Sequence, residues 1–269
     1  GELRDEEIEA RMVGREIGHA IYPPRATPVD PSQEVLQLRG VMLDGSLDSV
    51  DLSLHRGEIL GIAGLKGSGG ETILSVINGD GAASDGEMFL REKRYRPRRP
   101  SDAWRHGIAY MPGDRAREGI ILDFSIRVNL SMPSIPHRGP FVDHAAETQI
   151  AQDLVSTLKI KAASIEAVCT SLSGGNLQKV VLGKCLVPNP TILLLNNPTR
   201  GIDVGARMEI YRVIRQLTEN GVSVLLVSED LPELIGMSDR IFVMRKGRIS
   251  HIFQHGESFT EEEVVRHMI

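Results

Sequence analysis

"EILGIAGLKGSGGET", residues 58 to 72, joins an almost continuously apolar run to a cluster of glycines. The apolar run, Glu58–Gly64, is typical of a strand that is covered on both faces in a parallel sheet. Glycines then recur at Gly64, Gly67 and Gly69, where a helical pattern begins. A glycine-rich loop between a strand and a helix can hold phosphate with its backbone N–H groups, whereas the alternative is a tight structural turn. We expect a phosphate loop formed by Gly64, Leu65, Lys66, Gly67, Ser68, Gly69, Gly70, Glu71 and Thr72.

Two later runs, Thr191–Leu195 and Val222–Ser228, have the same buried-strand character, and helical periodicity lies between them at Arg207–Asn220. The order strand, helix, strand predicts a doubly wound α/β core with a parallel sheet. Ahead of the first buried strand, residues 34–58 alternate in short runs that predict antiparallel strands. Residues 114–184 lack buried strands and predict a helical subdomain. The runs "RIFVM" and "RISHIF" near the end predict a hairpin.

The first 33 residues differ from the rest. Residues 1–20 are acidic with a helical pattern, and four prolines follow within residues 22–33, which predicts a helical lead-in and an extended linker. We therefore expect a linker region from a preceding domain over residues 1–33 and one folded domain over residues 34–269.

The composition of the chain excludes several classes of partner and site. The chain has 269 residues and a formal net charge of -5, which argues against nucleic acid as a partner. Its one basic run, Arg91–Pro100, is read as a solvated hairpin or loop rather than a phosphate or lipid patch. Cys169 and Cys185 show no metal-binding spacing, and the histidines form no close pair, so we expect no metal site and a reducing compartment. No apolar stretch approaches the ~18 residues of a membrane span, so any membrane role must come through a partner.

A second motif, "SLSGGNLQKVVLGKCL" over residues 171–186, begins with Ser, Gly and Gly and continues as a helix. Together with the phosphate loop and with "TILLLNNPTRGIDVG" over residues 191–205, it resembles an ABC transporter ATPase across residues 34–269. The resemblance implies an ABC-type P-loop NTPase fold, with an antiparallel β subdomain and a helical subdomain beside the parallel-sheet core. It also implies a D-loop containing Asp203 and a signature motif made of Leu172, Ser173, Gly174, Gly175 and Asn176.

The stretches "PTRGIDVGARMEIY" and "VSEDLPELIGMSDRIFVMRKGRI" look closest to the second ATPase half of the duplicated subunit in bacterial ribose- and galactose-type importers. That resemblance implies the first ATPase half of the same subunit and a transmembrane permease as partners, and indirectly a sugar-binding protein. It places the chain at the cytoplasmic face of the bacterial inner membrane.

The phosphate loop departs from the family pattern. Gly70 stands where a lysine should reach the terminal phosphates, and Glu71 stands where a hydroxyl should hold magnesium. At a helix N-terminus the Glu71 carboxylate could accept the backbone N–H groups that a phosphate would use, so we expect it to cap its own loop. Lys66 could offset part of that charge, although an exposed loop lysine is the simpler interpretation.

Four catalytic positions depart as well. Asn196 and Asn197 replace the Asp that supports magnesium and the Glu that polarises the attacking water. An amide can hydrogen-bond a water but cannot accept its proton or balance a metal ion. Gly113 replaces a glutamine that contacts the metal, and Glu229 replaces the switch histidine.

These residues predict a catalytically degenerate cassette in which ATP binds weakly or not at all and Mg2+ is not supported. Because each site in an ABC dimer combines the phosphate loop of one half with the signature of the other, we expect the intact signature to serve ATP held by the first half. Two alternatives remain at this point: an active ABC ATPase that drives sugar import, and a non-transport ABC protein.

Overall fold

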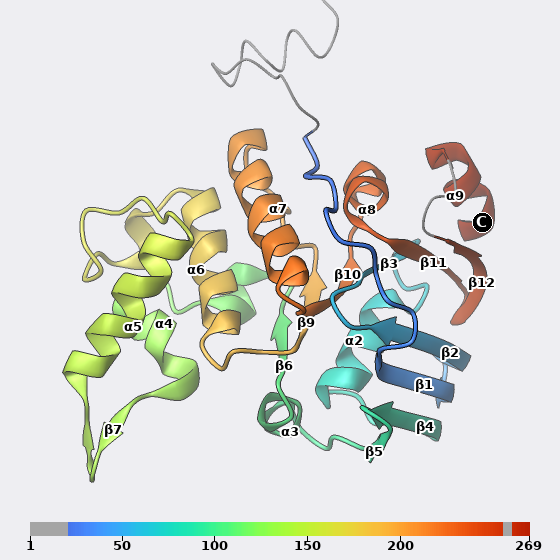
Figure 1. The fold of residues 1–269 in the computed structure, drawn as a ribbon, viewed down its shortest axis with the longest axis horizontal. Helices are drawn as coiled ribbons and strands as arrows, with labels where there is room; N and C mark the ends of the chain where they lie inside the picture. The colour runs from blue at the N-terminus through green and yellow to red at the C-terminus, as the bar shows by residue number, and fades with distance from the viewer. Residues whose placement is uncertain (1–20, 255–259) are drawn as a thin grey trace, which may run out of the picture.

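The computed structural model describes residues 21–254 and 260–269. The helical lead-in expected over residues 1–20 lies outside the described residues. Figure 1 shows a central sheet with an antiparallel sheet beside its lower right-hand part, and a group of helices at the far left. No helix within the described ranges is long and apolar enough to cross a membrane.

The central sheet has six strands in the order β12-β11-β3-β10-β9-β6. Every neighbouring pair is parallel except β11 and β12, which form the predicted hairpin. The predicted parallel core is therefore confirmed. The strands are β3 Ile59–Gly64, β6 Ile108–Met111, β9 Ile192–Asn196, β10 Ser223–Val227, β11 Arg240–Arg245 and β12 Arg248–Phe253.

Alternate residues of the parallel strands enter two separate cores, one on each face of the sheet. In β9, Leu193 and Leu195 pack in one core, whereas Leu194 packs in the other. Because both faces are covered, all five residues of β9 are buried. This explains why the strand is a continuous apolar run and does not alternate.

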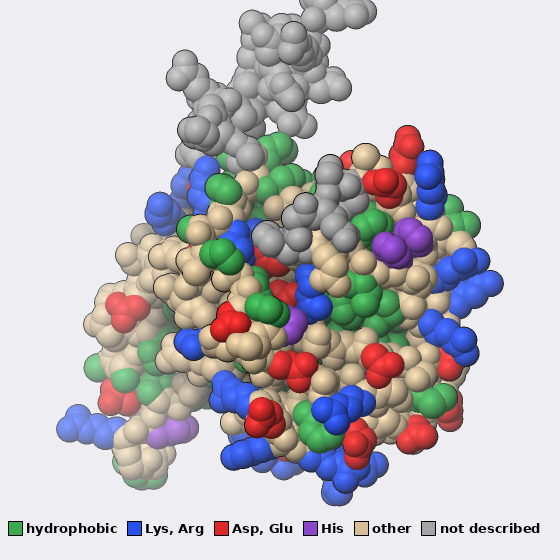
Figure 2. All heavy atoms as spheres, turned by 45° about the vertical axis from the view of Figure 1, so that its right-hand side comes forward, with side chains coloured by type: hydrophobic (Ala, Val, Ile, Leu, Met, Phe, Trp, Pro, Cys, Tyr) green, Lys and Arg blue, Asp and Glu red, His purple; other side chains and the backbone are tan. Residues whose placement is uncertain are grey.

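The second sheet is antiparallel, in the order β2-β1-β4-β5, as residues 34–58 predict. Its strands are β1 Glu34–Leu43, β2 Leu47–His55, β4 Asp85–Leu90 and β5 Lys93–Tyr95. The basic run belongs to the β4–β5 hairpin, where Arg94 forms an exposed ion pair with Glu87. Figure 2 shows basic and acidic side chains interspersed over one face of the molecule. The prediction of a solvated hairpin or loop is confirmed, since every charged side chain of the run is exposed.

Helices cover the central sheet and build the segment between residues 114 and 184. That segment also contains one exposed hairpin, β7 His137–Arg138 and β8 Phe141–Val142. The α-helices are α2 Gly70–Asn78, α3 Pro100–Arg105, α4 Ile126–Ser131, α5 His144–Thr157, α6 Gly174–Leu186, α7 Val204–Glu219, α8 Leu231–Met237 and α9 Glu261–Met268. The short turns are the π-helical η1 Arg115–Gly119 and the 3-10 helices η2 Met132–Ser134 and η3 Cys169–Ser171.

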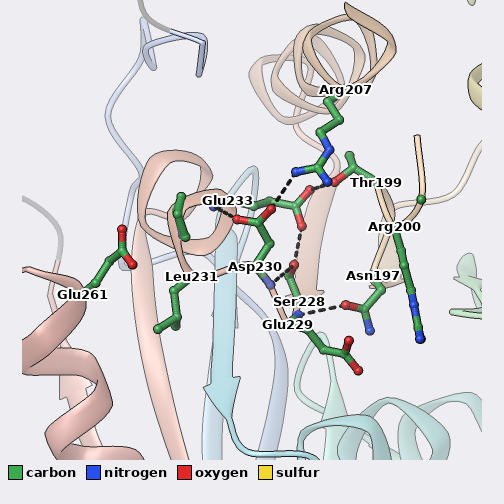
Figure 3. A pocket seen from close by; sticks show the side chains of 12 residues that line it. Asn197, Thr199, Arg200, Arg207, Ser228, Glu229, Asp230, Leu231, Glu233 and Glu261 are labelled. Carbon is green, nitrogen blue, oxygen red and sulfur yellow. Dashed lines mark hydrogen bonds and ion pairs between the residues drawn. The ribbon is translucent and has the colours of Figure 1, made fainter. Parts of the chain in front are cut away.

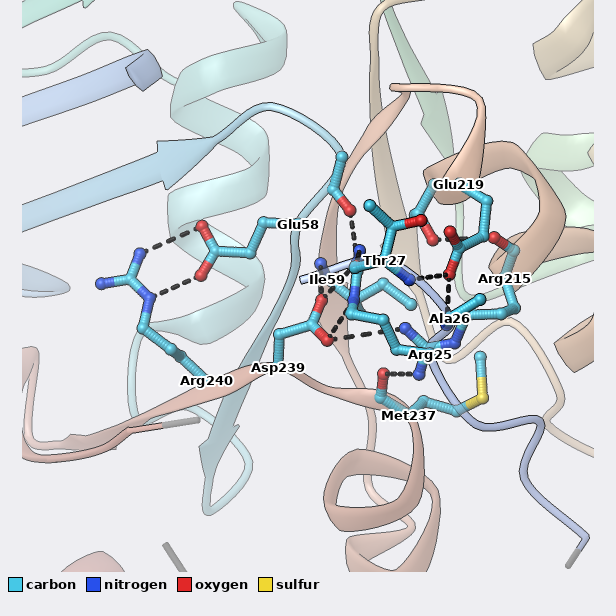
Figure 4. Close-up of polar contacts among 12 residues, drawn as sticks. Arg25, Ala26, Thr27, Glu58, Ile59, Arg215, Glu219, Met237, Asp239 and Arg240 are labelled. Carbon is cyan, nitrogen blue, oxygen red and sulfur yellow. Dashed lines mark hydrogen bonds and ion pairs between the residues drawn. The ribbon is translucent and has the colours of Figure 1, made fainter. Parts of the chain in front are cut away.

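Residues 21–30, which we call the strap, run over the folded domain ahead of β1 (Figure 1), and Figure 4 shows polar contacts that Arg25, Ala26 and Thr27 make with the domain. The Tyr22 ring lies 5.2 Å from the Tyr211 ring of α7, and burial, followed by the charges of Asp230 and Glu233, raises the pKa of Tyr22 to about 12. Arg25 forms two hydrogen bonds of 2.7 Å with the Asp239 carboxylate. The extended linker predicted here contains no helix or strand, but it packs on the domain instead of standing free.

Asp239 is 5% exposed and collects several donors at the start of β3. Its carboxylate accepts the Ile59 N–H at 2.8 Å, and Arg215 Nη1 lies 3.6 Å away. Arg215 Nε also donates to the Pro23 carbonyl at 3.1 Å. First-strand pairing starts at Glu34 as expected, but packing of the chain onto the domain starts at residue 21.

Candidate functional site

The phosphate loop lies at the carboxyl end of β3, directly before α2. Gly69 is the N-cap of α2 with a φ of 117°, a conformation that L side chains rarely adopt. Ser68 is buried, whereas Leu65 and Lys66 are exposed, so the lysine is an ordinary loop side chain. The hollow over the loop has a volume of about 30 Å³, and a buried water needs roughly 10 to 15 Å³. The loop geometry expected from the glycines is therefore present, over a small hollow.

Glu71 does not cap its own helix. Its Oε1 instead accepts a hydrogen bond from Asn196 Nδ2 at 3.3 Å. The expectation of a self-capped loop is wrong, because an amide donor at the end of β9 reaches the carboxylate.

The two neighbouring amides continue this chain of hydrogen bonds. Asn197 Nδ2 donates to Asn196 Oδ1 at 2.8 Å, and Asn197 Oδ1 accepts the Glu229 N–H at 2.8 Å. Asn196 and Asn197 are 7% and 4% exposed, so their polar groups depend on these partners. The network joins the phosphate loop to the ends of β9 and β10, and each amide uses both its donor and its acceptor.

Gly113 lies against the same network. A Cβ at this position would lie 3.1 Å from Asn196 Nδ2 and 3.2 Å from Asn196 Cγ. That is tighter than most real Cβ contacts, so a side chain at residue 113 would push on the amide that Glu71 accepts. The structure thus brings together four of the altered positions, Glu71, Gly113, Asn196 and Asn197, with the backbone of Glu229 as a fifth contact.

A larger pocket of about 530 Å³ opens on the other side of Asn197 (Figure 3). Within it, Thr199 Oγ1 donates to Glu233 Oε1 at 2.6 Å, and the Ser228 hydroxyl donates to Glu233 Oε2. Glu233 is 1% exposed, and burial raises the pKa of its carboxyl group. Sequence reasoning missed this pocket, because no spacing marks these three residues.

Arg207 Nη1 pairs with Asp230 Oδ2 at 2.6 Å on the same side of the pocket. Asp230 is also the N-cap of α8, where its Oδ1 accepts the Glu233 N–H at 3.1 Å. Two of the charged groups in the pocket wall, Arg207 and Asp230, are therefore already bound to each other.

The signature motif lies apart from the phosphate loop. Ser173 is the exposed N-cap of α6, and its Oγ accepts a hydrogen bond from Asn176 Nδ2 at 2.9 Å. Gly175 is buried against α7. A Cβ at this position would lie 2.5 Å from Ala206 Cβ, so a residue larger than glycine would force the helices apart. None of the described residues around the phosphate-loop hollow comes from the signature. Ser173 is thus exposed at the start of α6, and the signature contributes no residue to the hollow over the chain's own loop.

Asp203 lies beside the start of the signature helix, where its Oδ2 would be 3.7 Å from a Cβ on Gly175. It is the N-cap of α7, and its Oδ1 accepts the Ala206 N–H at 2.9 Å. Across residues 21–254 and 260–269, no three His, Cys, Asp or Glu side chains lie close enough together to hold a metal ion.

Comparison with known proteins identifies relatives of this arrangement. A family model described as "ABC transporter" matches residues 47–200. The chain is 40% identical over 258 residues to a ribose import ATP-binding protein of Bacillus cereus, which covers 95% of this chain and 52% of that protein. It is 40% identical over 272 residues to a xylose import ATP-binding protein of Geobacillus kaustophilus, which covers 98% of this chain and 53% of that protein. The chain thus spans about half the length of these curated relatives.

Solved structures agree on the fold. An ATP-binding cassette of an ABC transporter superposes with a TM-score of 0.77 at 22% identity, over 88% of this chain and 99% of that one. A nucleotide-free cassette gives a TM-score of 0.73 at 21% identity, over 87% and 94%.

Proposed function

Because this chain belongs to the ABC transporter family, we propose that it is the second, non-hydrolytic ATPase half of a subunit that powers import of a monosaccharide such as ribose or xylose. Its signature would complete the ATP site whose phosphate loop lies in the first half. The subunit would bind the cytoplasmic face of a permease in the bacterial inner membrane and couple ATP turnover to transport, and a sugar-binding protein would deliver the substrate. The domain itself would cover residues 34–269, with the helical subdomain at about 114–184.

One observation carries this proposal: the hydrogen-bond network of Glu71, Asn196 and Asn197 takes the place of a metal-binding group. In the family pattern a hydroxyl and an Asp share magnesium at positions 71 and 196. Here an amide donates directly to a carboxylate, so the two side chains bind each other without an ion. The residues present therefore do not fit Mg2+ beside a triphosphate.

The chemistry of hydrolysis is affected in the same way. Asn197 cannot accept a proton from water, and both ends of its amide are hydrogen-bonded. General-base catalysis is worth about 10² to 10⁴-fold in rate, and position 197, where the family pattern has the glutamate that polarises water, offers no carboxylate. We expect ATP hydrolysis by this chain alone to stay at background, and Asn197→Glu alone to leave it there.

The signature supports the second half of the proposal. Ser173 and Gly174 begin α6, where free N–H groups and the helix dipole favour an approaching phosphate. Ser173 is exposed, so a group from another domain can reach it.

The test is Ser173→Arg in the full subunit assembled with its permease in vesicles, with Ser164→Arg as the control. Ser164 is an exposed serine on the same subdomain and donates no side-chain hydrogen bond among the described contacts. We expect Ser173→Arg to abolish ATP turnover and sugar uptake, and Ser164→Arg to leave both unchanged. Full activity of Ser173→Arg, or rapid magnesium-dependent hydrolysis by the isolated chain, would overturn the proposal.

A further inference from the structure

Arg115 connects three parts of the domain that are far apart in the sequence. It begins the turn η1, two residues after Gly113. Its Nη1 donates to the Arg200 carbonyl at 2.6 Å, and its Nη2 donates to the Gly201 carbonyl at 3.3 Å. The guanidinium thus holds two successive carbonyls of the turn that leads to Asp203.

Gln178 of the signature helix contacts the same turn. Its Nε2 donates to the Pro198 carbonyl at 2.6 Å, and its Oε1 lies 3.4 Å from Arg115 Nη1 as an acceptor. Gln178 is 2% exposed, so its amide has a fixed position. The turn 198–201 is therefore clamped by two side chains that also contact each other.

The guanidinium also packs against the signature. A Cβ on Gly174 would lie 3.3 Å from Arg115 Nη2. Among the described residues, no Asp or Glu forms an ion pair with Arg115, and its acceptors are neutral. A rigid planar fork with several donors suits two adjacent carbonyls, whereas a lysine ammonium is a single point charge.

We propose that Arg115 is a positioning residue for ATP turnover in the partner half, because it fixes the turn 198–201 to the start of the signature helix. This inference rests on the proposed function, in which Ser173 and Gly174 serve ATP held by the first half. The hydrogen bonds of Arg115 go to Gln178 and to the turn, and none goes to Ser173, so it acts by geometry: it keeps the signature and the D-loop in one arrangement as the two halves close.

The experiment compares Arg115→Lys, Arg115→Met and Arg117→Met in the full subunit with its permease, measuring kcat and KM for ATP. Arg117 is the matched control, since it is exposed, lies two residues further on in η1 and makes no side-chain polar contact among those described. We expect both Arg115 variants to lower kcat at least about tenfold with KM within about threefold, because misplacement affects the transition state more than ground-state binding. Arg117→Met should keep the wild-type values.

Thermal unfolding of each variant separates positioning from loss of fold. Arg115→Lys keeps the charge and most of the length, so it provides a folded variant even if Arg115→Met unfolds. Wild-type kcat for Arg115→Lys would overturn the proposal, as would a raised KM in Arg115→Met that Arg115→Lys restores, since charge alone would then suffice.

Ser173→Arg in the same vesicles distinguishes a failure of the inference about Arg115 from a failure of the proposed function. If Ser173→Arg is inactive and the Arg115 variants are normal, only the role of Arg115 fails. If Ser173→Arg is active, signature donation itself fails.

Discussion

Asn196→Asp restores the family's residue at one position, and we expect it to destabilise this domain. The amide Nδ2 that donates to Glu71 Oε1 at 3.3 Å becomes a carboxylate oxygen, so the contact changes from a hydrogen bond to a repulsion. Residue 196 is 7% exposed and cannot turn to solvent freely. Asn197 continues to donate to the oxygen that remains, so the rest of the network persists.

The magnitude follows from the distance. Two unit charges 3.3 Å apart repel by about 1.3 kcal/mol at a dielectric constant of 80 and by about 5 kcal/mol at 20. Glu71 is exposed, so screening moves the repulsion toward the lower figure. The lost hydrogen bond adds about 1 kcal/mol. We expect Asn196→Asp to lower the free energy of unfolding by about 2 to 4 kcal/mol at neutral pH.

Urea unfolding of Asn196→Asp, Glu71→Gln and the double variant measures the coupling directly. The glutamine amide can donate to the new carboxylate, so the double variant should recover most of the lost stability. Effects of the two substitutions that add within about 0.5 kcal/mol would refute the reasoning, because contacting residues show interaction energies above that value.

Three further predictions concern other parts of the fold. Arg25→Met should lower the free energy of unfolding by about 3 kcal/mol, since Asp239 would lose its bidentate partner in a buried position, and unchanged urea unfolding would mean that the strap is not bound in solution. Gly113→Ala should cost about 1 kcal/mol through its contact with Asn196, visible as a lower melting temperature. Burial raises the pKa of Glu233, so its contribution to stability is complete below the unfolded value of 4.5 and declines as pH rises through the folded value. Glu233→Gln lacks this decline, and its unfolding free energy relative to wild type should therefore increase from pH 4 to pH 8; a constant difference would contradict the assignment.

The parallel core could be predicted because its main strands are buried on both faces and appear as continuous apolar runs. The edge strand β6 was not predicted, because Ile108–Met111 is only four residues long and lies between Gly107 and Pro112. Its place beside β9 depends on sheet pairing, which local periodicity does not encode.

The sequence indicated which residues belong to the candidate site, but not which of them contact one another. Glycine spacing located the phosphate loop, and the end of an apolar strand located Asn196. The partner of Glu71 is 125 residues away, so a local rule about helix N-termini suggested capping where a long-range amide donor prevails. Arg115 belongs to none of the motifs and Gln178 follows the signature residues, and their contacts with the turn 198–201 appear only when that turn is folded against them.

The strap also determines how a mechanical load would enter the domain. Arg25 holds Asp239 beside the first residue of β3 and donates to the Gly57 carbonyl, whereas the phosphate loop follows the last residue of β3. Six residues of strand separate these points by roughly 20 Å. Tension on the chain ahead of residue 21 would therefore reach α7 and the amino end of β3 before it reached the phosphate loop.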